Sequence, residues 1–533
     1  MAELSVADHS VSPPRITIPR EYNAAHDLIE RNLRAGRGGK TAVIDHAGSY
    51  TYAQLAERVD RFAHALGELG IRMEERVLLC LLDTIDFPTA FLGCIKAGVV
   101  PIPVNTLLTA SDYTYMLRDS RARGLVVSSA LLPAFSNAIE ASPFIKNVMV
   151  SGGDAGTRGG HLDFAELIAS PRPPYEAAQT CCDDPCFWLY SSGSTGAPKG
   201  TVHLHSSLIH TAELYANAIL GVREDDVVFS AAKLFFAYGL GNGLTFPLSA
   251  GATAVLMAER PTPDAVFRVL REHQPTIYCG VPTLYASMLA SPALPGREEL
   301  SIRRCASAGE ALPAEVGNRW TEHFGVEILD GLGSTEMLHI FLSNRAGDVH
   351  YGTSGKPVPG YELRLIGDDG EEVAPGEAGE LQVRGPTSAA LYWNNRTKSR
   401  ETFVGQWTRS GDKYSQDADG NYVYAGRNDD MLKVGGIYVS PIEVESALIT
   451  HAAVLEAAVV GKADDDGLIK PLAFVVLKPG RMPAAELADE LKLHVKSKLA
   501  PYKYPRWLEF VDELPKTATG KIQRFKLRSL SGA

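Results

Sequence analysis

The stretch Ser191–Gly200 reads SSGSTGAPKG and directly follows the apolar run Phe187–Tyr190. Three serines, one threonine, three glycines and one lysine share these ten residues. Small residues let backbone N–H groups approach an anion, hydroxyl groups add hydrogen-bond donors, and Lys199 adds positive charge. We therefore expect a loop that leaves a strand, precedes a helix and holds the phosphates of a nucleotide.

The spacing of this stretch differs from the P-loop of Walker-type ATPases, which reads G-x-x-x-x-G-K-[ST]. Here Gly200 follows Lys199, in the place of the Ser or Thr of that motif. A Ser/Gly-rich stretch taken by itself is most often a solvated turn or linker. The apolar lead-in and the motifs farther along the chain favour phosphate binding instead.

Composition indicates a large protein of ordinary globular type. The chain has 533 residues, of which 45% are hydrophobic and 22% charged, so several structural units are expected. A net charge of −11 argues against nucleic acid as a main partner, because a phosphate backbone needs clustered cations.

Cysteine usage and hydropathy indicate a cytoplasmic protein. The seven cysteines are few, odd in number and mostly in apolar runs, which is typical of reduced thiols. The trio Cys181, Cys182 and Cys186 lacks the usual zinc spacing and has no nearby histidine, so we expect no metal there. The N-terminus has no apolar signal-peptide core. The charge-free stretch 234–258 is broken by glycines and a proline, so we expect buried core rather than a membrane span.

The order of patterns predicts an α/β fold. Short apolar runs alternate with helical patterns over residues 40–320, which predicts a large N-terminal domain of parallel α/β sheets. Residues 352–424 carry turn signals between strand-like runs and predict a β-rich subdomain. Polar residues 426–430 resemble a boundary. Beyond them, strands at 454–460 and 472–477 and a helix at 487–499 predict a small, mobile α+β domain.

Local patterns refine this organisation. Leu208, Ala212, Tyr215 and Ile219 fit one face of the helix after the phosphate loop, with Ser206 or Ser207 as its N-cap. The expected domains are residues 1–427 for ATP and acid binding, a hinge at 428–430, and a mobile C-terminal domain at 431–533.

Six motifs in register resemble the adenylate-forming enzymes, the superfamily of acyl- and aryl-CoA ligases, luciferases and peptide-synthetase adenylation domains. The resemblance covers nearly the whole chain. Its motifs are Ser191–Gly200, Lys233–Tyr238, Asp330–Glu336, the Asp412 region, Gly426–Gly436 and Lys516–Arg524. A finer resemblance, in PPRITIPREYNAAHDLIERNL near the N-terminus and in STEMLHIF, is to the benzoate–CoA ligases.

The resemblance implies that the chain uses ATP with Mg²⁺ and then CoA. It assigns the phosphates to Ser191, Ser192, Gly193, Ser194, Thr195, Gly196 and Lys199. It assigns the adenine pocket to Ala308, Gly309, Glu310, Asp330, Gly331, Leu332 and Gly333, and the ribose to Asp412 and Arg427. Leu332 departs from the tyrosine that the family often stacks on adenine, and Glu310 has the alternative role of an acid near a helix start.

The same resemblance implies three catalytic residues. Glu336 matches the acid that binds Mg²⁺, a hard cation that prefers carboxylate oxygen. Thr335 matches a hydrogen bond to the α-phosphate. Lys521 matches the lysine that contacts the carboxylate and the α-phosphate during adenylation, and a cation there suits charge that develops in the transition state.

Two half-reactions are implied by the motifs around the boundary. Asp429 matches the hinge about which the C-terminal domain rotates. After rotation, Lys433, Gly435 and Gly436 would line the tunnel for the pantetheine arm of CoA, where a side chain at 436 would obstruct the thiol. The family also implies a homodimer, which no pattern in the sequence itself addresses.

The acid-binding pocket is expected between Lys233–Gly239 and Leu338–Ile340. By resemblance its residues are Phe236, Ala237, Tyr238, Gly333, His339 and Ile340, which suit a small aromatic carboxylate such as benzoate. His339 would orient the carboxylate or satisfy a hydrogen bond in the core.

Three alternatives stay open. A ligase for a hydroxybenzoate, an aminobenzoate or an aliphatic acid would share every motif. An adenylation enzyme that loads a carrier protein normally needs an acid in the pocket to bind the substrate amine, and Lys233–Tyr238 offers none. A non-catalytic nucleotide-binding protein would lack some catalytic residues, which are all present here.

Overall fold

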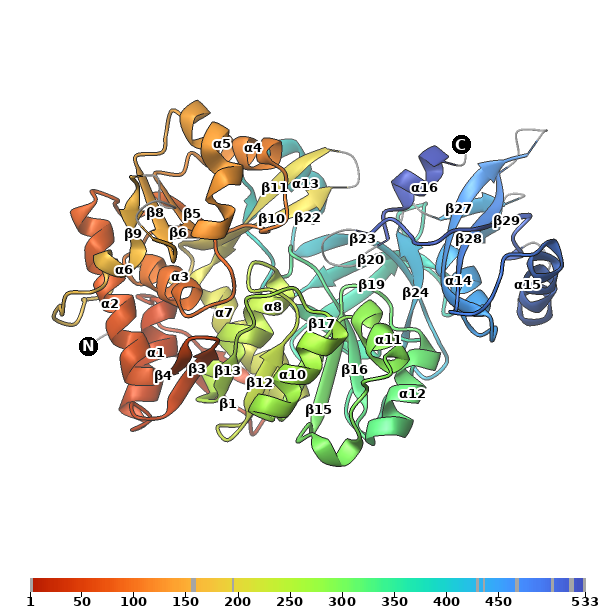
Figure 1. The fold of residues 1–533 in the computed structure, drawn as a ribbon, viewed down its shortest axis with the longest axis horizontal. Coiled ribbons are helices and arrows are strands. Elements are labelled where there is room, and N and C mark those ends of the chain that lie inside the picture. The colour runs from red at the N-terminus through yellow and green to blue at the C-terminus, as the bar shows by residue number, and fades with distance from the viewer. Residues whose placement is uncertain are drawn as a thin grey trace.

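The computed structural model describes residues 3–154, 160–193, 196–427, 431–434, 437–464, 469–499, 503–516 and 522–530. Side chains are not described at 192, 193, 196, 197, 427, 433, 437, 438 and 525. Figure 1 shows a larger part that holds the N-terminal elements and a smaller part at the right that holds the C-terminal ones.

A parallel sheet in the order β6-β5-β7-β8-β9 forms the upper left of Figure 1. Its strands are β5 (Arg76–Cys80), β6 (Val100–Pro103), β7 (Gly124–Ser128), β8 (Asn147–Ser151) and β9 (Leu162–Asp163). The helices in this stretch of chain are α2 (Tyr52–Glu68), α3 (Asp86–Lys96), α4 (Ala110–Ser120), η1 (Ser129–Phe135), α5 (Ser136–Ala141) and α6 (Phe164–Leu167). Buried runs of Val and Leu make these central strands, as predicted.

A second sheet runs in the order β18-β17-β16-β15-β14-β12-β13-β3-β4 and is parallel from β16 to β3. Its strands are β3 (Thr41–Asp45), β4 (Gly48–Thr51), β12 (Val227–Ser230), β13 (Thr253–Val255), β14 (Ile277–Gly280), β15 (Arg304–Ala308), β16 (Ile328–Gly333), β17 (Ile340–Ser343) and β18 (Lys356–Pro357). The prediction of parallel α/β sheets over residues 40–320 is confirmed.

Among the described residues, ten helices belong to the same part of the chain as this second sheet. They are α1 (Ala24–Arg34), α7 (His205–Thr211), the π-helices η2 (Ala212–Leu220) and η3 (Gly241–Thr245), α8 (Ala237–Leu240), α9 (Phe246–Ala250), α10 (Pro263–His273), α11 (Pro282–Ala290), η4 (Arg297–Glu299) and α12 (Ala314–Phe324). Two π-helices are notable because such segments concentrate at functional sites.

The stretch Ser191–Gly200 corrects one prediction. It is the end of a β-hairpin, in which β10 (Pro185–Gly193) pairs antiparallel with β11 (Gly196–Leu204), rather than a loop between a strand and a helix. The helix begins only after β11. Its N-cap is Leu204 without a side-chain hydrogen bond, so the prediction of Ser206 or Ser207 as N-cap is wrong. The predicted apolar face of that helix is buried.

Antiparallel strands follow, as predicted for residues 352–424. They are β19 (Glu362–Ile366), β20 (Gly379–Arg384), β22 (Phe403–Val404), β23 (Trp407–Gln416) and β24 (Tyr422–Arg427). Between them, β21 (Leu391–Tyr392) leaves this sheet and pairs with β11, and α13 (Arg396–Thr402) follows it.

The C-terminal part has its own core. Its elements are β25 (Leu432–Val434), β26 (Ile437–Val439), α14 (Pro441–Ile449), β27 (Val454–Ala463), β28 (Ile469–Leu477), α15 (Ala485–Lys498), β29 (Trp507–Phe510) and α16 (Arg524–Leu530). Val444, Leu448, Val459, Val475 and Leu491 pack together inside it. The predicted strands and helix are present, whereas the boundaries at 427 and 431 stay a prediction because residues 428–430 lie outside the described residues.

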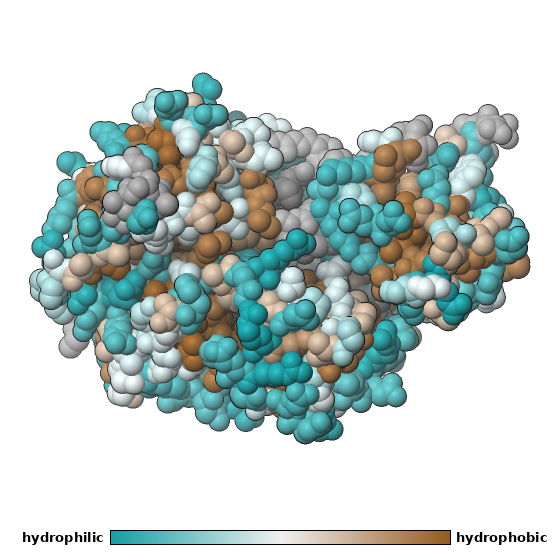
Figure 2. All heavy atoms as spheres, in the orientation of Figure 1, coloured by the Kyte–Doolittle hydropathy of each residue, from teal (hydrophilic) through white to brown (hydrophobic). Residues whose placement is uncertain are grey.

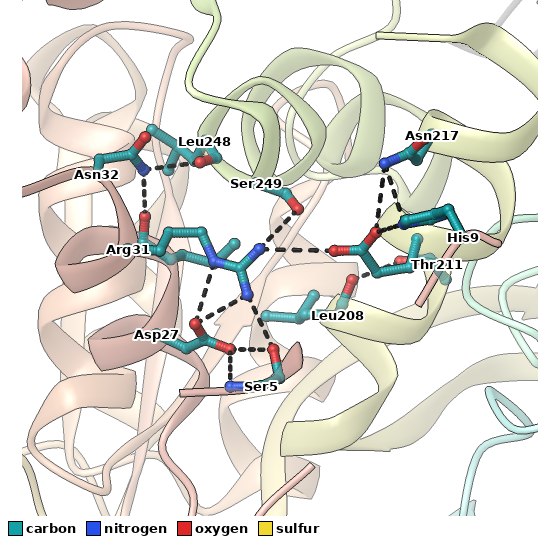
Figure 3. A network of polar contacts seen from close by, with 12 residues as sticks. Ser5, His9, Asp27, Arg31, Asn32, Leu208, Thr211, Asn217, Leu248 and Ser249 are labelled. Carbon is teal, nitrogen blue, oxygen red and sulfur yellow. Dashed lines mark hydrogen bonds and ion pairs between the residues drawn. The ribbon is translucent and has the colours of Figure 1, made fainter. Parts of the chain in front are cut away.

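The N-terminal segment is fastened by a polar network (Figure 3). It carries the hairpin β1 (Val6–Asp8) and β2 (Arg15–Thr17). Arg31 on α1 bonds Asp27 at 2.9 Å and lies 3.5 Å from Glu213 on η2. Nε2 of His9 lies 2.9 Å from the other oxygen of Glu213. The network therefore joins the N-terminal segment and α1 to the π-helix η2.

Hydrophilic side chains dominate the viewed face over α10 in Figure 2. Within the described part of the chain, no helix is both long enough and apolar enough to cross a membrane. The charge-free stretch 234–258 instead forms α8, η3, α9 and β13, most of whose residues are buried.

Candidate active site

The hairpin of β10 and β11, which is predicted to bind phosphate, is held at its base by aromatic side chains. The hydroxyl of Tyr190 donates to Asp119 at 2.7 Å, and the indole of Trp393 donates to the Asp119 carbonyl oxygen at 3.0 Å. Trp393 also packs on Trp188 of β10 with ring centroids 4.5 Å apart. Burial raises the pKa of the Asp119 carboxyl, and the Tyr190 hydrogen bond opposes that rise. These contacts give the hairpin a fixed place beside α4.

At the tip, the register brings Ser191 opposite Lys199 and Gly193 opposite Gly196. The side chain of Ser192 is not described, and Ser194 and Thr195 lie outside the described residues. Their assignment to phosphate binding stays a prediction.

Glu336 meets this hairpin. The Ser191 hydroxyl donates to Oε1 of Glu336 at 3.3 Å, and the Tyr392 hydroxyl donates to the same oxygen at 2.7 Å. Nζ of Lys199 lies 3.5 Å from the Tyr392 hydroxyl and 4.5 Å from the centre of its ring. The structure therefore brings together three predicted residues, and it adds Tyr392, which no predicted motif contained.

The oxygens around Glu336 suit Mg²⁺. Both hydroxyl donors reach Oε1, and Oε2 accepts no hydrogen bond from any described residue. Across the described ranges, no group of three or more His, Cys, Asp or Glu side chains could hold a metal ion by itself. One carboxylate is nevertheless the usual protein contribution when substrate phosphates supply the other ligands of Mg²⁺. The donor set therefore fits a nucleotide-bound magnesium ion.

The turn that carries Thr335 and Glu336 is fixed from β11. Nε2 of His203 lies 2.8 Å from the Thr335 carbonyl oxygen. Burial lowers the pKa of His203 to about 4, so the imidazole is neutral and Nε2 carries the hydrogen that it donates. Leu338 closes the turn in the left-handed region at φ 65°. His203 lies outside every predicted motif. Its contact with the Thr335 carbonyl oxygen depends on where the fold places β11.

The predicted adenine pocket lies where β15 and β16 run side by side. The pairing of Ala308 with Gly331 and of Ser307 with Asp330 places the two predicted segments next to each other. Gly309 turns the chain away at φ 98°, and Glu310 and Leu332 are half-buried. Gly333, at the end of β16, has no room for a side chain, since an added Cβ would lie 2.7 Å from the His339 carbonyl oxygen.

The pKa of Asp330, in this predicted pocket, is strongly shifted. Its side chain is buried, and burial raises the pKa of the carboxyl to about 8 despite a hydrogen bond from the Leu312 N–H at 3.4 Å. Its Oδ1 has no hydrogen-bond partner among the described residues. A buried acceptor without a partner is costly, so a ligand donor at Oδ1 would stabilise it.

The two residues that are predicted to bind the ribose lie on neighbouring strands. Asp412 on β23 pairs in register with Arg427 on β24. The Asp412 N–H donates to the Ser410 hydroxyl at 3.1 Å, and Gly411 between them has φ 76°. Asp412 is buried, and the side chain of Arg427 is not described.

The predicted acid pocket is built on α8 and η3. The imidazole of His339 packs against Tyr215, Tyr238 and Phe246, with ring centroids 5.0, 5.6 and 4.6 Å away. Burial lowers the pKa of His339 to about 3, so the ring is neutral. Its Nδ1 and the Tyr238 hydroxyl have no hydrogen-bond partner among the described residues.

The chain around the pocket is tightly packed. Gly241 lies so close to His339 that an added Cβ would be 2.5 Å from its Cδ2. Phe236 and Ala237 are half-buried, and Ile340 is buried on β17. Tyr215 and Phe246 also surround His339. The sequence patterns predict only a helix face for Tyr215 and buried core for Phe246.

Lys233 begins the segment that is expected to line the acid pocket. Its ammonium group donates to the carbonyl oxygens of Met257 and Glu259 and lies 3.8 Å from buried Asp83. Burial lowers its pKa. Lys233 therefore anchors the start of the aromatic segment, and these three partners compensate its buried charge.

Besides Ser194 and Thr195, four predicted residues cannot be placed. Asp429, Gly435, Gly436 and Lys521 lie outside the described residues. Lys433 lies on β25, and its side chain is not described. The hinge, tunnel and catalytic-lysine assignments stay predictions.

Comparison with known proteins identifies the relatives of this chain. The family model of the AMP-binding enzyme matches residues 29–393, and that of the AMP-binding enzyme C-terminal domain matches residues 443–521. A benzoate–CoA ligase of Thauera aromatica is 68% identical over 99% of this chain and 100% of its own length.

Two solved structures share the fold over nearly their whole length. A benzoate CoA ligase from Burkholderia xenovorans LB400 has a TM-score of 0.90 and 60% identity, covering 95% of this chain and 100% of that one. The anthranilate CoA ligase AuaEII in complex with anthranoyl-AMP has a TM-score of 0.93 and 46% identity, covering 97% of this chain and 98% of that one.

Proposed function

The chain belongs to the AMP-binding enzyme family, and from this premise we propose that it is an ATP-dependent benzoate–CoA ligase. The observation that carries the proposal is the 68% identity with the benzoate–CoA ligase of Thauera aromatica over essentially the full length of both chains. The contacts of Ser191 and Tyr392 with the Glu336 carboxylate, and of Lys199 with Tyr392, support it independently.

The reaction has two steps. A carboxylate oxygen of benzoate attacks the α-phosphorus of ATP, which forms benzoyl-AMP and releases pyrophosphate. The thiolate of CoA then attacks the benzoyl carbonyl carbon and displaces AMP, which forms benzoyl-CoA. Adenylation is needed because a free carboxylate is a poor electrophile, whereas AMP is a good leaving group.

The hairpin and the turn at Glu336 serve the phosphates. Lys199 and the hydroxyls of the hairpin tip bind the β- and γ-phosphates, and Thr335 binds the α-phosphate. Glu336, with Ser191 beside it, would hold Mg²⁺. When bound, this ion neutralises charge on the departing pyrophosphate. Ser191 already lies beside Glu336 before a nucleotide binds, so little reorganisation of this pair is needed as charge develops.

The nucleotide is recognised at two carboxyl groups. Oδ1 of Asp330 accepts a hydrogen bond from the adenine amino group, which gives that buried atom a partner. Asp412, supported by the Ser410 hydroxyl, binds the ribose hydroxyls together with Arg427. The backbone of Ala308, Gly309, Glu310, Gly331, Leu332 and Gly333 forms the walls around the base.

The acid pocket selects a flat aromatic carboxylate. Tyr238, His339 and Ile340, with Phe236, Ala237 and Gly333, line it. Nε2 of the neutral imidazole of His339 lies 3.4 Å from the Tyr238 carbonyl oxygen and carries the hydrogen, so Nδ1 is an acceptor toward the pocket. The close packing of His339 against Tyr215 and Phe246 keeps the pocket short.

The C-terminal domain supplies the remaining groups. We place it at residues 431–533, joined to the domain 1–427 by a hinge at 428–430 that includes Asp429. In one orientation Lys521 contacts the reacting carboxylate and α-phosphate. In the other, Lys433, Gly435 and Gly436 line the tunnel through which CoA arrives.

A hydroxy- or aminobenzoate is the second candidate substrate. The Tyr238 hydroxyl and His339 Nδ1, both buried without partners among the described residues, favour a ring substituent that forms hydrogen bonds. An aliphatic acid or a carrier-protein acceptor has no such observation in its favour. We further propose a cytoplasmic location, consistent with seven free cysteines, and a homodimer, by analogy with the family.

The experiment is to incubate the purified protein with ATP and Mg²⁺, with and without benzoate, and to measure pyrophosphate without CoA. Benzoate-dependent pyrophosphate, followed by benzoyl-CoA when CoA is added, is expected. Pyrophosphate release that does not depend on an aromatic acid would contradict the proposal. Loading of a carrier protein without any thioester to CoA would also contradict it.

A further inference from the structure

Tyr392 lies between two groups that the proposed reaction uses. It sits on β21, whose pairing with β11 sets Tyr392 opposite Thr201. The backbone N–H of Trp393 donates to the Gly200 carbonyl oxygen at 2.7 Å, and the backbone N–H of Tyr392 donates to the Ser399 hydroxyl oxygen at 2.9 Å. The side chain is buried, and its ring packs against Phe403 with centroids 5.2 Å apart. The position of the phenol is therefore set by the strand and not by a mobile loop.

The phenol has two distinct surfaces. Its hydroxyl donates to Oε1 of Glu336 at 2.7 Å, the length of a hydrogen bond to a charged acceptor. Its ring faces the ammonium group of Lys199, which lies 4.5 Å from the ring centre, within the range of a cation–π interaction. Glu336 and Lys199 come from separate segments of the chain, and one side chain contacts both.

We propose that Tyr392 is a positioning residue that orients the Glu336 carboxylate for the metal ion of the nucleotide and aligns Lys199 with the phosphates. This inference rests on the proposed function. The hydroxyl occupies Oε1 together with Ser191, and it thereby turns Oε2, which accepts no hydrogen bond from a described residue, toward the ion. The ring holds the Lys199 ammonium group by a cation–π contact at 4.5 Å, which fixes where its charge lies beside the hairpin.

Two substitutions separate the two surfaces. Tyr392→Phe removes the 2.7 Å hydrogen bond to Glu336 and the long 3.5 Å contact of the hydroxyl with Lys199, and it keeps the cation–π contact of the ring with Lys199. Tyr392→Leu removes both the hydroxyl and the ring. The matched control is Tyr22→Phe, because the Tyr22 hydroxyl also donates to a carboxylate, that of Asp27, at 2.7 Å inside the protein and lies on the N-terminal segment, remote from Glu336 in sequence.

The test is calorimetric binding of AMPPCP, a non-hydrolysable ATP analogue, with Mg²⁺ and with EDTA. For Tyr392→Phe we expect about a tenfold loss of affinity for the Mg²⁺ complex, a difference of about 1.4 kcal/mol, and less than a twofold change in EDTA. For Tyr392→Leu we expect losses in both conditions. Tyr22→Phe should match the wild type in both.

Several results would overturn the inference. They are equal losses for Tyr392→Phe with and without Mg²⁺, no loss in either condition, or the same metal-dependent loss in the Tyr22→Phe control. A second readout distinguishes a folding defect from a loss of positioning. Every correctly folded variant should convert pre-made benzoyl-AMP and CoA to benzoyl-CoA at the wild-type rate. If the wild type makes no benzoyl-CoA at all, the proposed function fails, and the binding data still judge Tyr392 by itself.

Discussion

Replacement of Asp330 by asparagine tests the electrostatics of the proposed adenine pocket. Asp330 is 3% exposed, and burial raises the pKa of its carboxyl to about 8 from the ordinary value of 3.8. The folded protein therefore keeps a proton at neutral pH that the unfolded chain releases. Asparagine has nearly the same shape, does not titrate, and retains a carbonyl oxygen that can accept a hydrogen bond.

The magnitude and the sign follow from proton linkage. Because the native state binds more protons than the unfolded state, the stability that Asp330 contributes is complete below about pH 4 and is lost as the pH rises to about 8. Each pH unit in this window lowers the free energy of unfolding by about 1.4 kcal/mol. Between about pH 5 and about pH 7 the Asp330→Asn variant should therefore gain roughly 2–3 kcal/mol relative to the wild type.

The assay is urea unfolding of both proteins at several pH values, with exposed Asp419→Asn as the control. The difference in unfolding free energy between Asp330→Asn and wild type should widen with pH and then level off above about pH 8. The control should run parallel to the wild type. Parallel curves for Asp330→Asn as well would show that Asp330 is not held protonated, and the reasoning from burial would be refuted.

Three further predictions concern packing, the N-terminal network and catalysis. Gly241→Ala should raise the benzoate KM about tenfold and leave the ATP KM unchanged in initial-rate kinetics, because the added Cβ would lie 2.5 Å from His339; equal changes in both constants would contradict this. Arg31→Met should lower the free energy of unfolding by about 3–5 kcal/mol, because two buried carboxylates, including that of Glu213, lose their cation; an unchanged urea midpoint would refute it. Lys521→Ala should abolish adenylation and spare thioester formation from benzoyl-AMP in single-turnover assays, and equal loss of both steps would exclude domain alternation.

The layered fold could be predicted from the sequence because its signals are local. Buried strands such as Val77–Cys80 are continuous apolar runs, and the amphipathic helices between them have the helical period. The hairpin at Ser191–Gly200 could not be predicted in this way. Its composition is that of a loop, and its strand character comes from the antiparallel pairing of β10 with β11, while β21 pairs with β11 just beyond it, at Thr201 and Val202.

The candidate site shows the same difference between residues with a local sequence signal and residues without one. Motif resemblance predicted Asp330, Glu336 and Lys199, whose residue types suit the proposed chemistry, and these assignments stay predictions. It could not find Tyr392 or His203, because each acts only through a neighbour that the fold brings to it. The partners of Lys233 could not be predicted either, because the carbonyl oxygens that bind it come from the chain after β13.

The most direct test of the central claim is the rate of AMP formation with ATP, Mg²⁺ and CoA across a panel of acids. The panel contains benzoate, 4-hydroxybenzoate, 2-aminobenzoate, cyclohexanecarboxylate, acetate and hexanoate. The account predicts that benzoate leads the non-aromatic acids in kcat/KM by at least about tenfold, or about 1.4 kcal/mol in transition-state binding. A lead by acetate, hexanoate or cyclohexanecarboxylate would contradict the assignment of Tyr238 and His339 to an aromatic pocket.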